Sequence, residues 1–154
     1  MLPMRRGSRF AEPEHSPGFL LWQVTRRWQR ELGTALAPLG LTHVQFVLLA
    51  VVWWAGEHDE LAPTQRELAA LARTDPMMTS QVLRTLEAKG LVERAGDAGD
   101  RRARRVSATA EGAELARRAI AVVEAADERF FAAVPERVPF ERGLAALAAM
   151  EERT

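Results

Sequence analysis

Cysteine is absent from this 154-residue chain. Its absence excludes a disulfide framework, a thiolate metal site and a thiol redox switch within these residues, and it suits a cytoplasmic protein. Net charge is absent as well, because 21 acidic residues balance 21 basic ones. The overall charge therefore gives no support to nucleic-acid binding, and only a local concentration of charge would give it.

Long apolar runs are also missing. The longest run, residues 46–55, is far shorter than the roughly 18 residues that a membrane-spanning helix requires, so no membrane partner is expected. The first ten residues are basic, but the apolar stretch of a signal peptide does not follow them. We expect residues 1–15 to be a disordered tail. With 47% hydrophobic and 27% charged residues, the chain suits one globular domain, here residues 16–154.

Helix-start signals divide the first half of this domain. Ser16 followed by proline is typical of a helix N-cap, and apolar residues at helical spacing predict a helix that ends near residues 38–40. Thr42 begins a capping box, and the segment after it is apolar on nearly every side. This pattern predicts a buried helix that runs to Trp54 and is closed by Gly56.

Two shorter helices are predicted next. Thr64 opens a second capping box before a helix over residues 65–72. Asp75 precedes a proline and suits the N-cap of a helix over residues 76–89. Gly90 then stands where a left-handed residue usually ends a helix. The two helices are therefore joined by a turn of three or four residues.

The periodicity changes after the fourth helix. Residues 91–95 and 103–107 are short extended candidates, and the turn-forming cluster at residues 96–100 separates them, so a β-hairpin is predicted. Thr109 then caps a long helix to about residue 134, and Pro139 opens a last helix. One side of the long helix is expected to carry Leu115, Val122, Ala126 and Phe130. The fold class is thus mainly α with a small β-hairpin wing.

Two helices joined by a short turn and followed by a hairpin form the pattern of a winged helix-turn-helix, here over about residues 42–108. A helix fits the major groove of double-stranded DNA, and a cationic hairpin can reach the neighbouring backbone or minor groove. Side chains that face away from the apolar stripe of the second helix are candidates for contacts to base edges: Met77, Met78, Ser80, Gln81 and Arg84. In the alternative, the methionines turn inward and the polar side chains are only solvated.

Positive charge is concentrated in the second half of the hairpin. Between Asp100 and Val106 there are four arginines and one acid, and the acidic residues that balance them lie elsewhere. Such arginines can neutralise DNA phosphates, although a charge run is also compatible with a merely solvated face. The four candidates are Arg101, Arg102, Arg104 and Arg105.

The segment from Asp100 to Thr109 resembles the wing signature of MarR-family regulators, in which Asp-x-Arg is followed after five residues by Leu-Thr; here Ala108 replaces the leucine. Residues 64–91 are similar to the helix-turn-helix of that family, and the order of the flanking helices agrees over nearly the whole chain. The resemblance implies that Arg102 enters the minor groove, that Asp100 orients the wing arginines, and that Thr64 lies among the DNA contacts.

The same resemblance implies a two-fold homodimer in which the first, fifth and sixth helices interleave. Their apolar surface exceeds what one small protomer is expected to bury, although a monomeric bundle is the alternative. The residues expected to need a partner are Trp28, Leu32, Leu115, Phe130, Phe131, Phe140 and Leu144.

A ligand-responsive repressor is the function that the resemblance implies, with a small aromatic or phenolic effector bound between the dimer helices and the winged region. Residues placed in such a crevice are Trp22, His43, Phe46 and Trp53, although core packing and satisfied polar groups are the favoured explanation of His43 and Trp53. The three histidines lack metal-ligand spacing, and no cofactor or metal is expected. No nucleophile elbow or phosphate loop is visible, so an enzyme is not predicted. A winged helix that binds only protein, or a small helical enzyme, are the alternatives.

Overall fold

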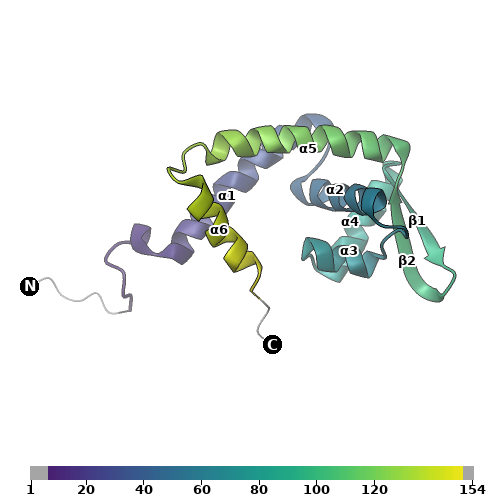
Figure 1. Cartoon of the computed structure of the whole chain (residues 1–154), viewed down its shortest axis with the longest axis horizontal. Coiled ribbons are helices and arrows are strands. Elements are labelled where there is room, and N and C mark those ends of the chain that lie inside the picture. The colour runs from purple at the N-terminus through teal and green to yellow at the C-terminus, as the bar shows by residue number, and fades with distance from the viewer. Residues whose placement is uncertain (1–6, 151–154) are drawn as a thin grey trace, which may run out of the picture.

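The computed structural model describes residues 7–150, without the side chains of Asp97 and Arg101. It is mainly helical with one antiparallel hairpin, which confirms the predicted fold class (Figure 1). Residues 1–6 of the expected tail lie outside the described residues, and residues 13–15 form a short 3-10 helix. In chain order the elements are η1 (Pro13–His15), α1 (Pro17–Leu36), η2 (Ala37–Leu39), α2 (His43–His58), α3 (Gln65–Ala72), α4 (Pro76–Ala88), β1 (Val92–Asp97), β2 (Asp100–Ala108), α5 (Ala110–Phe131) and α6 (Arg137–Ala148).

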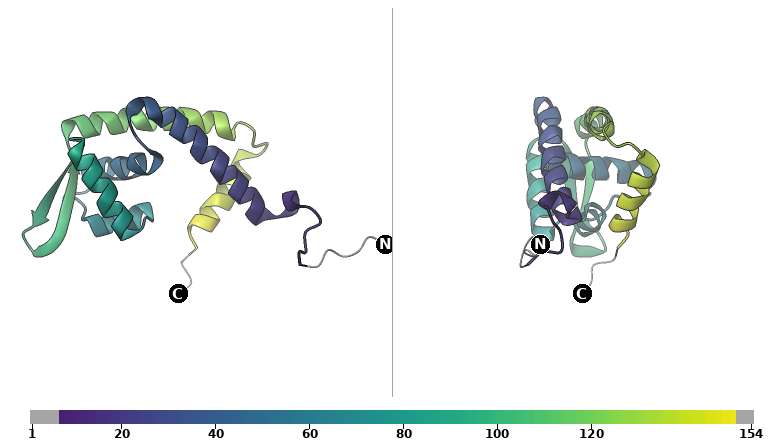
Figure 2. Two further views of the ribbon diagram at one scale, coloured as in Figure 1. Left: turned by 180° about the vertical axis from the view of Figure 1, so that it is seen from behind. Right: turned by 90° about the vertical axis from the view of Figure 1, so that its left-hand side faces the viewer.

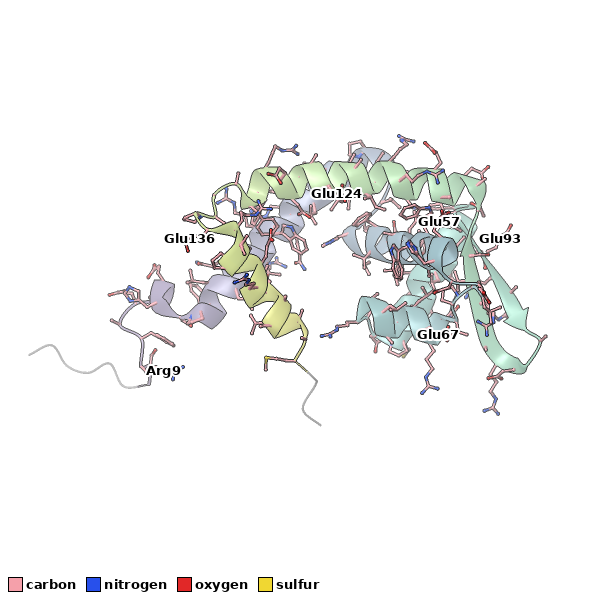
Figure 3. The ribbon with its side chains drawn as sticks, in the orientation of Figure 1. Arg9, Glu57, Glu67, Glu93, Glu124 and Glu136 are labelled. Carbon is pink, nitrogen blue, oxygen red and sulfur yellow. The ribbon has the colours of Figure 1, made fainter. Side chains whose placement is uncertain are left out.

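Side-chain caps begin most of these helices at the predicted residues. Thr42 and Thr64 form complete capping boxes with the third residues of α2 and α3. The partner of Thr64 is Glu67, which Figure 3 labels on α3. Ser16, Asp75 and Thr109 each accept a backbone hydrogen bond from the first turn of the helix that follows. Each cap satisfies a donor that the helix itself leaves unpaired.

Three boundaries differ from the prediction. Gly56 lies inside α2, which continues to His58, because the buried apolar face of this helix outweighs the low helix propensity of one exposed glycine. The long helix α5 ends at Phe131 rather than near residue 134. The last helix starts at Arg137, two residues before Pro139, since proline is tolerated within the first turn.

The hairpin is longer than predicted, and its turn is shorter. Pairing runs from Val92 with Ala108 to Gly96 with Arg104, and the register becomes irregular between Gly96 and Asp97. The backbone N–H of Val106 donates to the carbonyl of Pro63 at 2.9 Å. The hairpin is thereby attached to the segment that leads into α3.

The main core lies inside the winged lobe, by which we mean α2, α3, α4 and the hairpin, and beneath α5. Leucine and valine side chains from all these elements meet there with less than 2% exposure: Leu48, Leu49, Val52, Leu68, Leu83, Leu86, Val92 and Val106. Small residues carry the buried stripe of α5, which comprises Gly112, Ala116, Ala119, Val123 and Ala126. Of the residues expected on one side of this helix, Ala126 is buried, whereas Leu115, Val122 and Phe130 are only partly buried, because a close approach of α5 to α1 and α2 favours small side chains.

Two segments lie outside this core. The N-terminal half of α1 and all of α6 extend away from the winged lobe, as the views from the front and from behind both show (Figures 1 and 2). No residue of α6 is buried. Exposed apolar side chains on these two segments are Phe19, Leu20, Leu21, Trp22, Val24, Val138, Leu144 and Leu147. They form the surface that a partner protomer would cover.

Some of the residues that were expected to need a partner protomer are covered within the single chain, and others stay exposed. Leu32 is only 1% exposed and packs in the core of a single chain, so the expectation was wrong for this residue. Trp28 is partly buried, and its Nε1 donates to Asp127 Oδ1 at 2.7 Å. Phe131 packs against the rings of Phe130 and Phe140, with centroids 5.1 and 5.7 Å away. Leu144 stays exposed, as expected.

A substitution at Gly112 tests the junction between α5 and the winged lobe. A methyl group there would fall on the carbonyl oxygen of Leu91, well inside van der Waals contact. We expect Gly112→Ala to cost about 3 kcal/mol and to lower Tm by about 6–12 °C. Gly56→Ala is the matched control, because it meets no atom within 4 Å and should stabilise α2 by about 0.5–1 kcal/mol. Equal melting of the two variants would contradict this account.

Candidate nucleic-acid interface

The turn between α3 and α4 is held by a compact set of hydrogen bonds. The backbone N–H of Thr74 donates to the carbonyl of Ala69 at 2.9 Å, and the hydroxyls of Thr74 and Thr79 lie 2.6 Å apart. Asp75 Oδ1 accepts the backbone N–H of Met78 at 3.0 Å. Because Thr79 is buried, these bonds fix where α4 starts and which side of it faces the core.

Helix α4 presents the predicted side chains outward. Its buried residues are Thr79, Leu83 and Leu86, so the opposite face is open. Met77 is 83% exposed and Met78 is 40% exposed, which rules out the alternative that they turn into the core of this chain. Gln81 and Arg84 are exposed, and Ser80 is partly buried. Their contact with bases remains a prediction, but their orientation permits it.

In the wing, Arg102 and Arg104 are both exposed and stand on the same side of β2, because alternate residues of a strand share a face. Asp100 Oδ1 accepts the backbone N–H of Arg102 at 2.9 Å. This hydrogen bond orients the backbone at the start of β2 rather than a guanidinium group. Arg101 belongs to β2, but its side chain lies outside the part of the chain that the structure describes.

A groove of about 880 Å³ connects the wing to the helix-turn-helix. Thr64 and Arg66 line it from the start of α3, Pro76 from the start of α4, and Arg102 and Arg104 from the wing. Thr64 accepts the backbone N–H of the third residue of α3, so its hydroxyl already serves as a cap. The fold therefore brings the N-terminal end of α4 and two wing arginines to one concave surface. Sequence analysis did not select Arg66, which lies in the first turn of α3, within the capping box formed by Thr64 and Glu67.

Arg105 occupies a different place from the other wing arginines. It is partly buried on the opposite side of β2, and its Nη1 donates to the carbonyl of Ala62 at 2.6 Å. The structure thus makes Arg105 a support of the wing base, and its contact with a DNA phosphate stays a prediction. Strand alternation explains the difference, since neighbouring arginines in a strand point to opposite faces.

Arg94 is a second structural arginine, and sequence analysis did not single it out. Its Nε donates to Glu87 Oε2 at 2.8 Å and its Nη1 to Gln65 Oε1 at 3.0 Å, so it joins β1 to α4 and α3. The hydrogen bond from Arg94 lowers the pKa of the Glu87 carboxyl, and the positive charges of Arg94 and Arg104 act in the same direction. The sequence offered one signal for this structural role. Arg94 lies two residues after the buried Val92 in β1, so the two side chains share the face that packs against the helices.

The four aromatic residues proposed for an effector crevice lie in different parts of the described structure. Trp22 is 62% exposed on α1, and Phe46 is partly buried against the core. Trp53 lines an apolar cavity of about 310 Å³ between α2, α3 and α5, where Trp54, Leu71 and Ile120 also contribute. Among the described residues, no hydrogen-bond partner reaches the buried Nε1 of Trp53.

His43 packs in the corner between α1, α2 and α5. Its ring meets that of Trp28 edge to face, with the centroids 5.1 Å apart. Burial lowers the pKa of His43, and the nearby carboxylate of Asp127 opposes this shift only in part. The imidazole is therefore favoured in its neutral form, as expected of a residue that serves packing.

Neither a metal-binding cluster nor a single membrane-spanning helix is found among residues 7–150. No group of three or more His, Asp or Glu side chains there is arranged to hold a metal ion. No single helix of this part of the chain is both long enough and apolar enough to cross a membrane; only 17–39 together with α2, bent by 71°, would reach that length and composition.

Comparison with known proteins gives consistent results. The family model described as MarR family matches residues 41–103. The HTH-type transcriptional regulator YdcH of Bacillus subtilis (strain 168) is 47% identical over 137 residues, which are 89% of this chain and 92% of that protein. The HTH-type transcriptional repressor Rv2887 of Mycobacterium tuberculosis (strain ATCC 25618 / H37Rv) is 37% identical over 129 residues, 82% of this chain and 89% of the repressor.

Solved structures agree over nearly the whole length. CouR from Rhodococcus jostii RHA1 bound to p-coumaroyl-CoA has a TM-score of 0.77 and 32% identity, covering 94% of this chain and 100% of that one. The complex of Mycobacterium tuberculosis Rv2887 with DNA has a TM-score of 0.67 and 34% identity, with 87% of this chain and 98% of that chain covered.

The lowered pKa of His43 predicts how stability depends on pH. As the pH falls below the ordinary value of 6.5, the unfolded chain takes up this proton before the folded chain does. The contribution of His43 to stability is therefore complete above pH 6.5 and is lost as the pH falls through the lower folded value. Urea unfolding at about pH 7.5 and about pH 5 measures how much the free energy of unfolding falls between these two pH values. This decrease should be smaller for His43→Gln than for the parent. A parent whose His43 proton resonances titrate above pH 6.5 would contradict the prediction.

Proposed function

This chain belongs to the MarR family, and we propose from that premise that it binds a pseudo-palindromic DNA operator as a homodimer and regulates transcription from it. The single observation that carries this proposal is the groove shared by α4 and the wing. The outward residues of α4, Gln81 and Arg84 among them, have the size and polarity to meet base edges in the major groove. Arg102 and Arg104 line the groove that reaches the start of α4 at Pro76, and from there they are available to the minor groove and the phosphates.

The homodimer follows from the exposed apolar residues of α1 and α6. Large side chains such as Phe19, Trp22 and Leu147 are too numerous on these helices to remain in water. A two-fold axis through this surface would place two α4 helices about 34–36 Å apart, one turn of the DNA duplex. We take residues 16–154 as the single unit that forms each half of the dimer.

Repression relieved by a ligand is the form of regulation that the relatives support. Rv2887 is named a repressor, and it has been solved both with DNA and with salicylic acid. In this chain, apolar side chains form the walls of the cavity beside Trp53, and the indole N–H of Trp53 is buried without a partner among the described residues. A ligand that displaces the side chains around this N–H would gain it as a hydrogen-bond donor. A small aromatic carboxylate or phenol fits those two features, and by binding there it would change the spacing of the two α4 helices.

We infer that the chain acts in the cytoplasm and carries no catalytic activity of its own. The exposed arginines of the wing favour DNA binding over a winged helix that binds only protein. Arginines that line a groove suit contacts with DNA phosphates, which a protein partner does not offer. A small helical enzyme is disfavoured because none of the described residues forms a nucleophile and base pair in a cleft.

Replacement of DNA-facing residues should reveal two kinds of contact. Gln81→Ala should cost about 1–3 kcal/mol on the best operator and relax the preference at one or two positions per half-site. Arg104→Ala should weaken all duplexes nearly alike and lower the salt slope by about 0.9 for each phosphate that is no longer neutralised. Salt-dependent titrations on operator, mutated operator and random duplex separate the two effects. Arg118→Ala, an exposed arginine of α5, is the control. Unchanged binding by all variants would refute the proposed interface.

Removal of the indole N–H of Trp53 tests the effector cavity. Trp53→Phe keeps an aromatic ring but deletes the donor, so salicylate should bind about tenfold more weakly, the typical effect of removing one hydrogen bond to a charged group. Trp22→Phe, which changes a tryptophan of α1 that is 62% exposed and does not line this cavity, should have little effect. Calorimetry and operator titrations with and without salicylate give both readouts. Saturable binding that leaves operator affinity unchanged would show that the two sites are not coupled.

A further inference from the structure

We propose that Arg66, in the first turn of α3, and Arg73, directly after its end, form a second phosphate-binding pair that extends the DNA interface beyond α4 and the wing. This inference rests on the proposed DNA-binding function and adds two residues to it. We call them the α3 arginine pair.

The two arginines stand at opposite ends of α3. Arg66 lies in the first turn of the helix, and Arg73 follows its last residue. Both lie outside the buried core. They line one cavity of about 590 Å³, to which Ala69, Ala70 and Met150 also contribute.

The positive charge is continuous with the wing. Arg66 lines both this cavity and the groove that contains Arg102 and Arg104. A cationic path therefore runs from the wing across the start of α3 to the turn before α4. Neither arginine of the pair forms an ion pair with another described residue, so both charges are available to an external anion. The nearby acid, Asp75, is engaged in capping α4.

The backbone at Arg73 is the second observation. Arg73 has φ 50°, and among the described residues it is the only non-glycine residue with a positive φ. The turn imposes this value, because the N–H groups of Arg73 and Thr74 both return to carbonyls at the end of α3. Glycine is the usual residue at such a position, since a Cβ atom is strained there.

Elsewhere the chain follows that rule. Gly40 and Gly90 hold the left-handed positions after η2 and α4, with φ of 69° and 73°. At the turn of the helix-turn-helix an arginine stands instead, although glycine would suit the backbone better. A long cation that lines the cavity next to the groove explains this exception.

The test uses the full-length dimer and a substitution that relieves the backbone while it removes the charge. Arg73→Gly should leave Tm unchanged or raise it by about 2–4 °C. The same variant should bind every duplex roughly tenfold more weakly, with a salt slope smaller by about 1.8 for the two protomers. Arg66→Ala should show the same decrease in slope, and Arg73→Lys should retain most of the parent slope. Arg118→Ala on α5 controls for a change in overall charge.

The outcomes are distinct. A smaller salt slope with unchanged or higher Tm supports the pair as a DNA contact, because a purely structural role would lower Tm. Parent-like slopes for both Arg66→Ala and Arg73→Gly, together with a reduced slope for Arg104→Ala, would overturn the inference and leave the proposed function intact. If the parent itself binds no duplex DNA even at low salt, the proposed function and this inference both fail.

Discussion

The joint at which α4, the hairpin and α5 meet is a set of short backbone contacts. The carbonyl of Leu91 accepts the backbone N–H of Thr109 at 3.0 Å, and the hydroxyl of Thr109 donates to the carbonyl of Gly90 at 2.6 Å. Gly112 lies against the same Leu91 carbonyl with no room for a methyl group. One short segment thereby joins the end of α4, the base of the wing and the start of α5, so these three elements are held together at one point.

Arginines have two different roles around this joint. Arg94 and Arg105 are bound to neighbours within the winged lobe and hold the hairpin against α3 and α4. Arg102 and Arg104 are left exposed on the face that the hairpin turns toward the groove. A hydrogen-bonded arginine at the wing base limits the motion of the strand, so that the exposed arginines start close to their bound positions. Preorganisation of this kind lowers the entropic cost of binding.

Much of the local structure was predictable, because it depends on residues a few positions apart. Capping by Thr42, Thr64, Asp75 and Thr109 is a short-range contact, and each of these helices starts where its cap predicts. The outward face of α4 followed from the spacing of its apolar residues. The boundaries at Gly56 and Pro139 were missed because tertiary packing, in the first case, and the tolerance of a first turn, in the second, outweigh local propensity.

The sequence by itself determined the order of the elements, the winged pattern and the concentration of arginines, since periodicity and turn chemistry are properties of neighbouring residues. Tertiary structure alone decided which arginines remain exposed, because that depends on strand register against Ala62, Gln65 and Glu87, far away in the chain. It also decided that α5 packs against α1 and α2 through small residues. Leu32, likewise, is buried within a single chain rather than at a dimer interface. Both results follow from the geometry of packing between distant segments, which no local pattern encodes.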